Sequence, residues 1–254
     1  MLKKLFRLFL PLTLILSLSA CATDPSRSAF AQEETEPPST LLGETEDRGQ
    51  DYLDSFIFFG ESTTYHLKSR GVLSGGTETT QVWAPDNGTV NLDATTTALK
   101  IRYPETGEYL TVAQAAARKQ PRYMLLTFGL NGAPGNVKRG ADYFKGCYRQ
   151  LIEAILEASP TTRIILQSAF PVASNMDMSR YTVTLDELNE HIDTLNGWTR
   201  ELAEEMGLRY LNSAEILRDG QGRLKITYQN GDGHHLTKQA YLVLLEYIRT
   251  HGYQ

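Results

Sequence analysis

The chain has 254 residues, of which 41% are hydrophobic and 22% are charged, and its formal net charge is -5. These values are ordinary for a globular protein of one or at most two domains. Lysine and arginine are spread along the chain and form no basic stripe that could follow a phosphate backbone, so we expect no nucleic-acid partner.

The chain begins with a targeting signal. A positively charged head at residues 3–7 precedes an apolar run at residues 8–18, which is too short to span a bilayer comfortably. The run ends in Leu-Ser-Ala-Cys at residues 18–21, which is similar to a bacterial lipobox, the sequence that a signal peptidase cuts just before a lipidated cysteine. We therefore expect a signal peptide at residues 1–20 and a lipid such as palmitate on Cys21. This lipid would anchor the protein at the extracytoplasmic face of a bacterial cell membrane.

An ordinary secretory signal that is cut elsewhere is the alternative, and Cys21 would then be incidental. The scarcity of cysteine favours the lipid anchor, because the chain contains 2 cysteines and one of them stands at the expected place. The other, Cys147, lies in a helical pattern with no histidine nearby in the sequence. We expect it to be a small buried apolar residue without a disulfide partner.

The segment that follows Cys21 is rich in Ser, Thr, Glu and Pro, and residues 22–50 hold seven acidic residues against two basic ones. Such a composition cannot bury enough apolar surface to offset the entropy lost on ordering. We therefore predict a disordered acidic tether at residues 21–50 and one folded domain at residues 51–254. A chain of about 200 residues can bury enough of its surface in a single core without disulfides or metals.

From residue 51 onward, short apolar runs alternate with amphipathic helical patterns. The runs suit strands buried on both faces of a parallel sheet, and they cover residues 55–59, 81–83, 123–127, 163–167 and 208–211. The helical patterns cover residues 112–119, 143–158, 185–206 and 237–250. This alternation predicts an α/β domain with a parallel central sheet and helices on both faces. In such sheets the ligand site lies beyond the carboxyl ends of the strands.

The first apolar run is followed directly by Gly60, Glu61 and Ser62. Glycine permits a tight turn, and a serine at the start of the next helix lies among free backbone N–H groups. Such a serine can attack a carbonyl carbon while its own N–H helps to hold the resulting oxyanion. The alternative is a turn that only caps a helix, which is the commoner role of such a segment.

Two later segments offer complementary groups. Asn131 follows the run at residues 123–127, where its amide can point into the crevice or simply stabilise a turn. Asp232 and His235 precede the last helix, and their spacing brings them together on one turn, so the carboxylate can accept from Nδ1–H and leave Nε2 as a base. A solvated loop or a metal pair with His234 is the alternative. We expect no metal, because no third and fourth ligand stand at a convincing spacing.

Together these segments resemble the sequence blocks of the SGNH (GDSL-like) hydrolase superfamily, which are Gly-Asp-Ser near the start, Gly-x-Asn-Asp in the middle and Asp-x-x-His near the end. The corresponding positions are residues 60–62, 129–131 and 232–235, and the resemblance covers essentially all of residues 51–254. It implies a flavodoxin-like three-layer α/β/α sandwich.

The resemblance also implies roles for individual residues. Ser62 resembles the nucleophile, His235 the general base and Asp232 the acid that orients the base. Asn131 resembles an oxyanion donor, beside the backbone N–H of Ser62. His66, four residues after Ser62, could reach toward the same crevice, but we expect it to be a partly exposed helix residue or a substrate contact.

Some positions depart from the family's pattern. Glu61 replaces the aspartate of the first block, and Gly132 replaces the aspartate after the block asparagine, which places the chain in a divergent branch. The family's second block contributes a glycine N–H to the oxyanion. We predict Gly88 for this role, with Gly75 and Gly76 as alternatives; any of them could instead serve only a turn with positive φ.

The resemblance implies a serine ester hydrolase that forms an acyl-enzyme and needs no metal or organic cofactor. We expect a monomer that acts on small-molecule or glycan esters, with O-acetyl or other short acyl groups on envelope or extracellular glycans as the preferred class. An O-acyltransferase with the same triad is one alternative. The other is a non-catalytic glycan- or peptide-binding lipoprotein, which the altered Glu61 and Gly132 and the aromatic residues Tyr65 and Trp83 favour. Core packing is an equally good role for Trp83.

Overall fold

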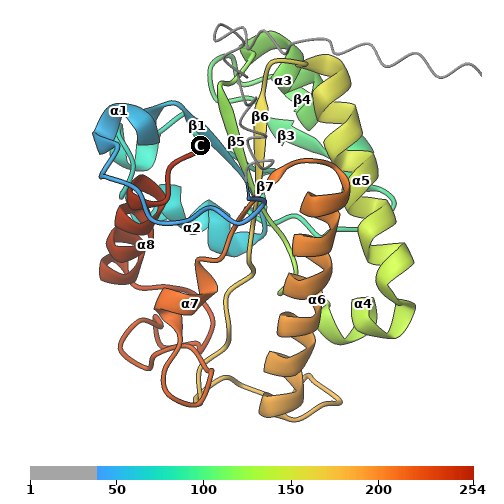
Figure 1. Ribbon diagram of the computed structural model, residues 1–254, viewed down its shortest axis with the longest axis vertical. Helices are drawn as coiled ribbons and strands as arrows, with labels where there is room; N and C mark the ends of the chain where they lie inside the picture. Colours follow the sequence, from blue (N-terminus) through green and yellow to red (C-terminus); the bar gives the residue numbers. More distant parts are fainter. Residues whose placement is uncertain (1–38) are drawn as a thin grey trace, which may run out of the picture. The chain divides into compact units, whose positions relative to one another are not determined.

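Five parallel strands form the centre of the computed structural model, which describes residues 39–254 (Figure 1). In their order across the sheet these strands are β2 (Val82–Trp83), β1 (Phe56–Gly60), β5 (Tyr123–Thr127), β6 (Arg163–Gln167) and β7 (Arg209–Leu211). Every neighbouring pair runs parallel. This is the flavodoxin-like order, in which the connections from β1 and β2 lead to opposite sides, and it directs a ligand to the carboxyl ends of β1 and β5.

The central strands are apolar along their whole length because both of their faces are covered. All five residues of β1 and of β5 are buried. Successive side chains alternate between the two faces, as strand geometry requires. In β1, Ile57 and Phe59 belong to the core on one side of the sheet, and Phe56 and Phe58 to the core on the other.

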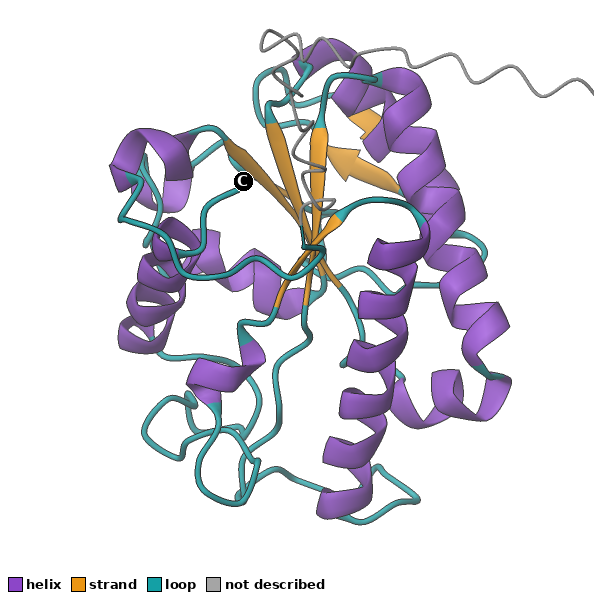
Figure 2. Cartoon of the chain, viewed as in Figure 1, coloured by secondary structure: helices purple, strands orange, loops and turns teal. Residues whose placement is uncertain are grey.

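Helices cover each face, which confirms the predicted three-layer arrangement (Figure 2). The face of Ile57 is covered by α3 (Val112–Lys119), α4 (Ala133–Arg139), α5 (Ala141–Ala158) and α6 (Leu185–Glu205). The face of Phe56 is covered by α1 (Gly49–Asp54), α2 (Ser62–Ser69), α7 (Ala214–Leu217) and α8 (Lys238–Thr250). Cys147 lies in α5 and is buried, as predicted.

Side chains at three helix starts fix where the helices begin. Thr111 and Gln114 form a capping box at α3, and Thr184 and Glu187 form one at α6. Each box satisfies two backbone N–H groups that would otherwise lack a partner. At α8 the Thr237 hydroxyl accepts a hydrogen bond from the third residue of the helix. This cap fixes the point at which the preceding turn, residues 232–235, enters the helix.

The folded unit begins before residue 51, so the prediction of a disordered tether up to residue 50 is wrong at its end. Leu41 forms a parallel bridge with Tyr210 at the edge of β7, where the Leu42 N–H donates to the Tyr210 carbonyl at 2.9 Å. Thr45 donates its N–H to the carbonyl of Thr250 at 2.6 Å. Backbone pairing does not depend on side-chain polarity, so it orders a segment whose composition alone predicts disorder.

Several short elements were not predicted, because they span too few residues to show a hydrophobic period. These are α1, α4, α7, two 3-10 helices (Gly76–Glu78 and Thr96–Ala98) and an antiparallel pair, β3 (Lys100–Arg102) with β4 (Tyr109–Thr111). The strands and long helices match their predicted positions to within two residues at each end.

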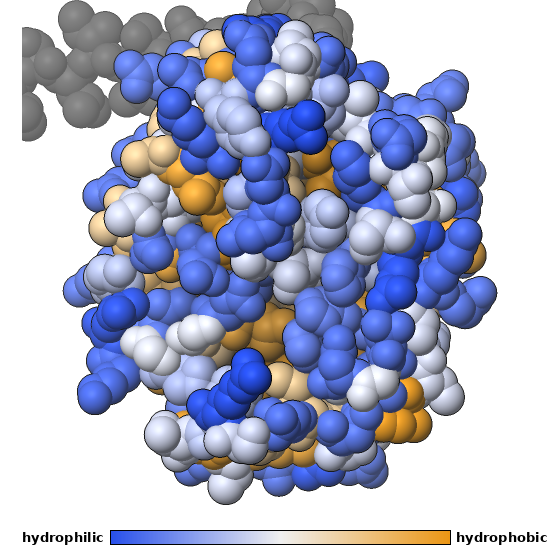
Figure 3. All heavy atoms as spheres, turned by 180° about the vertical axis from the view of Figure 1, so that it is seen from behind, coloured by the Kyte–Doolittle hydropathy of each residue, from blue (hydrophilic) through white to orange (hydrophobic). Residues whose placement is uncertain are grey.

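The predicted signal peptide at residues 1–20, the lipidation site Cys21 and the first part of the predicted tether lie outside the described residues. Between residues 39 and 254, no helix has both the length and the apolar character needed to cross a membrane. The face shown in Figure 3 is mostly polar, with its apolar residues in small separate patches. Scattered patches of this kind are usual on a folded domain in water.

Two buried asparagines on α6 hold the segment that leaves β6. Asn196 accepts from the Ala169 N–H at 2.7 Å and donates to the Ala169 carbonyl at 3.1 Å. Asn189 makes the same pair of bonds with Val172, at 2.9 and 3.3 Å. Their spacing of seven residues is close to two helical turns, so both amides lie on one face of α6. The segment thus gains from side chains the hydrogen bonds that a strand would gain from a neighbour.

We expect Asn196→Leu to lower the free energy of unfolding by about 3 kcal/mol, because leucine fills the same space but leaves the buried N–H and carbonyl of Ala169 without partners. Urea denaturation followed by circular dichroism measures the loss. Thr194→Ala, on the exposed side of the same helix, is the control and should change stability by less than about 0.5 kcal/mol. Equal stability of Asn196→Leu and the wild type would contradict this account.

Candidate active site

The carboxyl end of β1 presents a serine at the first position of α2. Gly60 allows the close approach of β1 and β5 there, because a Cβ at Gly60 would overlap the carbonyl oxygen of Thr127 and lie 2.6 Å from Thr64 Oγ1. Behind the serine, the hydroxyl of Tyr241 on α8 donates to the Thr63 carbonyl at 2.6 Å. These two buried contacts fix the turn, so the half-buried Ser62 side chain occupies a defined place at the edge of the sheet.

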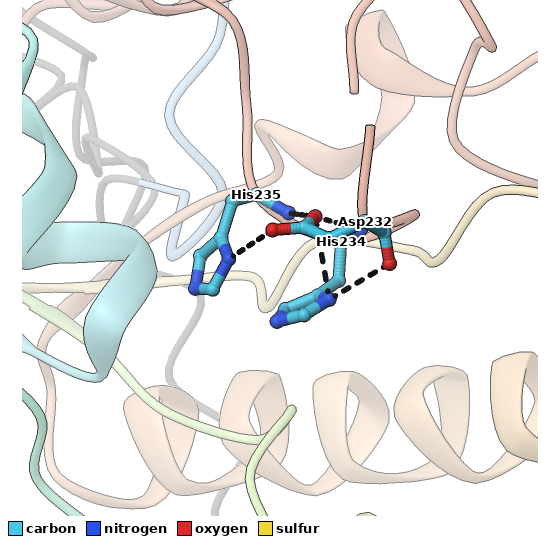
Figure 4. A group of neighbouring side chains, drawn as sticks. All are labelled: Asp232, His234 and His235. Carbon is cyan, nitrogen blue, oxygen red and sulfur yellow. Dashed lines mark hydrogen bonds and ion pairs between the residues drawn. The ribbon is translucent and has the colours of Figure 1, made fainter. Parts of the chain in front are cut away.

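Ser62, His235 and Asp232 form one line of hydrogen bonds, although 173 residues separate the first two. Ser62 Oγ lies 2.9 Å from His235 Nε2. On the other side of the ring, His235 Nδ1 lies 2.7 Å from Asp232 Oδ2 (Figure 4). The structure therefore brings together the hydroxyl, imidazole and carboxylate that the sequence singled out. The distances allow proton transfer from the hydroxyl to the imidazole.

The turn that carries the acid and the base is held by the acid itself. Asp232 Oδ1 accepts the backbone N–H groups of His234 at 3.0 Å and of His235 at 2.9 Å. Burial raises the pKa of Asp232, but these two N–H groups and the bond to the His235 ring outweigh it, so the net pKa is lowered. Asp232 is therefore a carboxylate at neutral pH and favours the tautomer of His235 with the proton on Nδ1.

The turn at residues 232–235 packs against the segment after β6, which is hydrogen-bonded to Asn189 and Asn196 of α6. The Ala173 N–H donates to the carbonyl of Gly233 at 2.7 Å. Gly233 has a φ of 86°, and a Cβ there would lie 2.5 Å from the Cα of Met176. Only glycine fits this approach, since other residues would meet both backbone strain and a clash. The position of His235 thus depends on Asn189 and its neighbours through the segment that contains Ala173.

Glu61 joins the first and the middle segments of the site. Its side chain is 2% exposed, and its two carboxylate oxygens accept the backbone N–H groups of Gly129 at 3.0 Å, Leu130 at 3.1 Å and Asn131 at 3.1 Å. Burial raises the pKa of Glu61 to about 7, although the three N–H groups oppose this shift. Both oxygens of Glu61 are engaged by the backbone, so its role is structural. It holds the turn after β5 against the turn after β1.

Asn131 lies at this edge as predicted, and the N–H of Ser62 donates no hydrogen bond to the residues that the structure describes. The Asn131 amide donates one N–H to Thr89 Oγ1 at 3.0 Å. Its nitrogen carries two N–H groups, so a second remains for an oxyanion. The geometry is thus compatible with both donors, whose roles in an oxyanion hole stay predictions.

Gly88, the predicted third donor, has its N–H in another bond. The N–H donates to the Pro85 carbonyl at 2.9 Å, which closes a turn in which Gly88 has a φ of 71°. A Cβ at Gly88 would lie 2.8 Å from the ring of Tyr65. The alternative Gly76 also donates its N–H, to Leu73 at 2.9 Å. These contacts indicate that the turn itself requires a glycine at position 88.

Two further histidine rings contact the His235 ring. The centroid of the His66 ring is 4.1 Å from that of His235, and the centroid of the His234 ring is 3.9 Å from it. Burial lowers the pKa of His66 to about 4. Burial also lowers the pKa of His235, against the opposing effect of its bond to Asp232. The base is therefore neutral at neutral pH, the form that can accept a proton.

Asp232, His234 and His235 also meet a geometric condition for a metal site, since one possible ligand atom of each lies within 4.8 Å of the others. His235 Nδ1 and both Asp232 oxygens are already engaged with one another and with the turn. A metal would have to break the bonds that orient the imidazole. The arrangement fits a proton relay better than a metal centre.

A pocket of about 400 Å³ opens beside Asn131, Asp232 and His234. Its opposite wall comes from the segment between β6 and α6, which contributes Met176 and Arg180 among other residues. A larger pocket of about 500 Å³ lies along α2 and β3 and touches none of the three residues of the relay. Of the three, the smaller pocket is lined by Asp232 alone, and Asn131 also lines it, so it is the nearer of the two to the relay.

Sequence reasoning missed three features of this site: the bracing role of Glu61, the ring contact of His66, and the clamp by Asn189 and Asn196. The family has an aspartate where this chain has Glu61, so the sequence shows that Glu61 departs from the pattern. The sequence does not show the three backbone N–H groups that Glu61 binds. Trp83, weighed as a sugar-stacking residue, is 1% exposed and packs against Tyr103 in the core.

The sequence model of the GDSL-like lipase/acylhydrolase family matches residues 58–243 of this chain. This range contains Ser62, Asn131, Asp232 and His235. Among curated proteins, no significant match is found.

Solved structures are similar in fold at low sequence identity. A protein from Streptococcus pneumonia, described as a candidate platelet activating factor, is 19% identical over 76% of this chain and 81% of its own, with a TM-score of 0.53. The periplasmic domain of a lipopolysaccharide acetyltransferase from Salmonella ser. Paratyphi A is 20% identical over 76% and 80%, with a TM-score of 0.47. An acetylxylan esterase from Geobacillus stearothermophilus is 17% identical over 78% and 94%, with a TM-score of 0.43. The first of these similarities supports the α/β fold.

The raised pKa of Glu61 makes a prediction about stability. The unfolded chain loses this proton near pH 4.5 and the folded protein near pH 7, so the contribution of Glu61 to stability is lost as the pH rises through this window. Glu61→Gln removes the titration. Between pH 5 and pH 7.5 the wild type should therefore lose about 2 kcal/mol more stability than Glu61→Gln, as measured by urea denaturation. Because Glu61→Gln keeps every other titrating group, it also serves as the control for those groups. Equal losses of stability in the two proteins would contradict the account.

Proposed function

This chain belongs to the GDSL-like lipase/acylhydrolase family, and on that premise we propose that it is a serine esterase with Ser62 as nucleophile and His235 as general base. Asp232 orients the base. The observation that carries the proposal is the line of hydrogen bonds from Asp232 through His235 to Ser62, with lengths of 2.7 and 2.9 Å. Each of the three groups comes from a segment held by buried contacts, so the line is prepared before a substrate binds.

The proposed reaction has two steps. In the first, His235 Nε2 takes the hydroxyl proton as Ser62 Oγ attacks the ester carbonyl, and the new imidazolium gives that proton to the departing alcohol. In the second, His235 takes a proton from water, and the resulting hydroxide attacks the acyl-enzyme. The acid leaves as the imidazolium returns the proton to Ser62 Oγ. Asp232 stays ionised throughout and stabilises the imidazolium of both steps.

The negative charge on the carbonyl oxygen needs donors that point into the crevice. The Ser62 N–H and the free N–H of the Asn131 amide are the proposed donors, each lowering the barrier by about 3 kcal/mol. We keep Gly88 as a proposed third donor only on the condition that its bond to Pro85 opens when the substrate binds. The backbone bonds from Gly129 and Asn131 to Glu61 would hold the amide in position.

We propose short acyl esters on hydroxyl-rich molecules, such as O-acetyl groups on envelope or extracellular glycans, as the substrates. The pocket beside the triad mixes polar groups of Asn175, Asp177, Arg180 and His234 with the apolar side chain of Met176. Such a mixture can bond several hydroxyl groups and also pack against a sugar ring. The proposed lipid on Cys21 would hold the enzyme, as a monomer, at the outer face of the cell membrane.

The two alternatives differ in what the triad does. An O-acyltransferase would use the same acyl-enzyme and a sugar hydroxyl in place of water. A non-catalytic binding protein would have no use for a serine bonded to an oriented imidazole. The line of hydrogen bonds therefore supports an enzyme over a binding protein, and acyl transfer to an added sugar is the measurement that separates hydrolase from transferase.

We expect Ser62→Ala to lower kcat for p-nitrophenyl acetate at least about 1,000-fold, because it removes the nucleophile but leaves the fold intact. A fluorophosphonate probe should label the wild type at Ser62 and leave the variant unlabelled, as mass spectrometry of the peptide would show. Turnover that persists in Ser62→Ala would remove this residue from the mechanism.

The two neighbouring histidines give a matched pair of variants. His235→Ala should lower kcat at least about 1,000-fold, since it removes the base. His234→Ala removes a ring whose Nδ1 contacts only its own turn, and it should keep more than about a tenth of the activity. The same p-nitrophenyl acetate assay measures both. The reverse order of activities would assign the base to His234.

A further inference from the structure

Three imidazole rings lie close together at the catalytic turn, where the rings of His66 and His234 each contact the ring of His235 at a tilt. His234 is the neighbour in the chain, whereas His66 comes from α2, four residues after Ser62. Residues four apart lie on the same face of a helix, one turn from each other. The nucleophile and the His66 ring therefore approach His235 from the same helix, Ser62 at its Nε2 and His66 at its face.

His66 is held by this contact and by burial, with no polar partner at its inner nitrogen. His66 Nδ1 is buried and has no hydrogen-bond partner among residues 39–254. Its ring lies 4.1 Å from the His235 ring, at an angle of 38° between the planes. A buried nitrogen without a partner lowers stability, so a gain elsewhere must keep the imidazole in this place. The observed contact of His66 is with the ring that must point at Ser62.

We propose that His66 is a positioning residue for the catalytic base: its ring closes one face of the His235 imidazole and holds Nε2 against the Ser62 hydroxyl. The proposal rests on the function proposed above, because it assigns His66 a role in the chemistry of His235. His66 itself touches no reacting atom. Without its ring, water would fill the space and the His235 side chain could turn about its Cα–Cβ and Cβ–Cγ bonds, away from Ser62.

The neighbouring rings also affect the imidazolium that His235 becomes during the reaction. When His235 takes the Ser62 proton, it becomes a cation beside two aromatic rings. A neutral ring stabilises an adjacent cation through its electrons, whereas a protonated ring repels it. His66 stays neutral where His235 works, because burial, then His235 and Arg70, lower the pKa of His66 to about 4.

The charged and titratable groups that act on His235 come from two segments. Its own turn provides Asp232, which favours the imidazolium, and His234, which opposes it. On the side of α2, Arg70 also opposes the imidazolium. His66 is the group of this set that touches the ring face from another element, and it adds no charge above about pH 4. A change at His66 should therefore act on the base through water access and ring orientation.

The experiment compares two substitutions at one position. His66→Phe keeps an aromatic ring of similar size, and His66→Ala removes the ring. His191→Ala on α6 is the matched control, because the Nδ1 of His191 is also buried without a partner, while its ring makes no contact with the triad in the described part of the chain. Each protein is assayed for kcat and KM with p-nitrophenyl acetate from pH 5 to pH 8. The ring protons of His235 are titrated by NMR over the same range.

We expect His66→Ala to lower kcat at least about tenfold with KM changed less than about twofold, since a misplaced base affects the chemical step more than binding. His235 should titrate at a higher pH in His66→Ala, because water reaches its ring, and the acid limb of kcat should move with it. His66→Phe should keep kcat within about threefold of the wild type and leave the titration of His235 unchanged. His191→Ala should match the wild type in every respect.

Two results would overturn the proposal. In the first, His235 titrates at the same pH in His66→Ala as in the wild type and kcat is unchanged. In the second, the alanine and phenylalanine variants lose kcat equally, which would assign the effect to a nitrogen of His66 and not to its ring. If the wild type neither hydrolyses the ester nor reacts with the fluorophosphonate, the proposed function fails, and the NMR titration still decides whether His66 controls His235.

Discussion

The buried carboxylate of Glu61 is the interaction on which the rest of the site depends. Its three bonds to backbone N–H groups join the end of β1 to the turn after β5. Because the side chain of Glu61 points into the protein, its neighbour Ser62 is turned to the open edge and begins α2. The same bonds place Asn131. One inward-facing acid therefore sets the positions of Ser62 and Asn131, the proposed nucleophile and the proposed oxyanion donor.

His235, the proposed base, is positioned by further contacts. The turn at residues 232–235 contains no buried acid like Glu61. It packs against the segment after β6, whose backbone is hydrogen-bonded to Asn189 and Asn196 of α6. That segment meets the turn at Gly233, where Met176 leaves no space for a side chain. Helix α8 supports both halves of the relay: its Tyr241 holds the turn of Ser62, and its cap at Thr237 fixes the end of the turn that carries His235. Helix α6 supports His235 from the other face of the sheet. Their meeting within hydrogen-bond distance is a property of the whole domain.

The sequence predicts those parts of this structure that have a period or a local pattern. Long buried strands and amphipathic helices were placed to within two residues, and the turn of Asp232 and His235 followed from their spacing alone. Contacts between distant segments leave no such mark: nothing local tells that Glu61 reaches the turn at residues 129–131, or that the ring of His66 meets His235. For the same reason, the sequence did not predict that residues 39–50 are ordered. Their backbone pairs with β7 and α8, and backbone pairing does not depend on side-chain polarity.

The extra methylene of Glu61 has a structural consequence that bears on the divergence of this chain. A glutamate reaches farther than the aspartate usual in the family, and here its two oxygens span three consecutive N–H groups in the turn after β5. The residue after Asn131 is Gly132, with a φ of 69°, so no carboxylate follows the block asparagine. A Cβ at Gly132 would meet no atom within 4 Å, so a side chain at this position would enter open space. The buried carboxyl group of Glu61 therefore braces the turn through its own three bonds to the backbone.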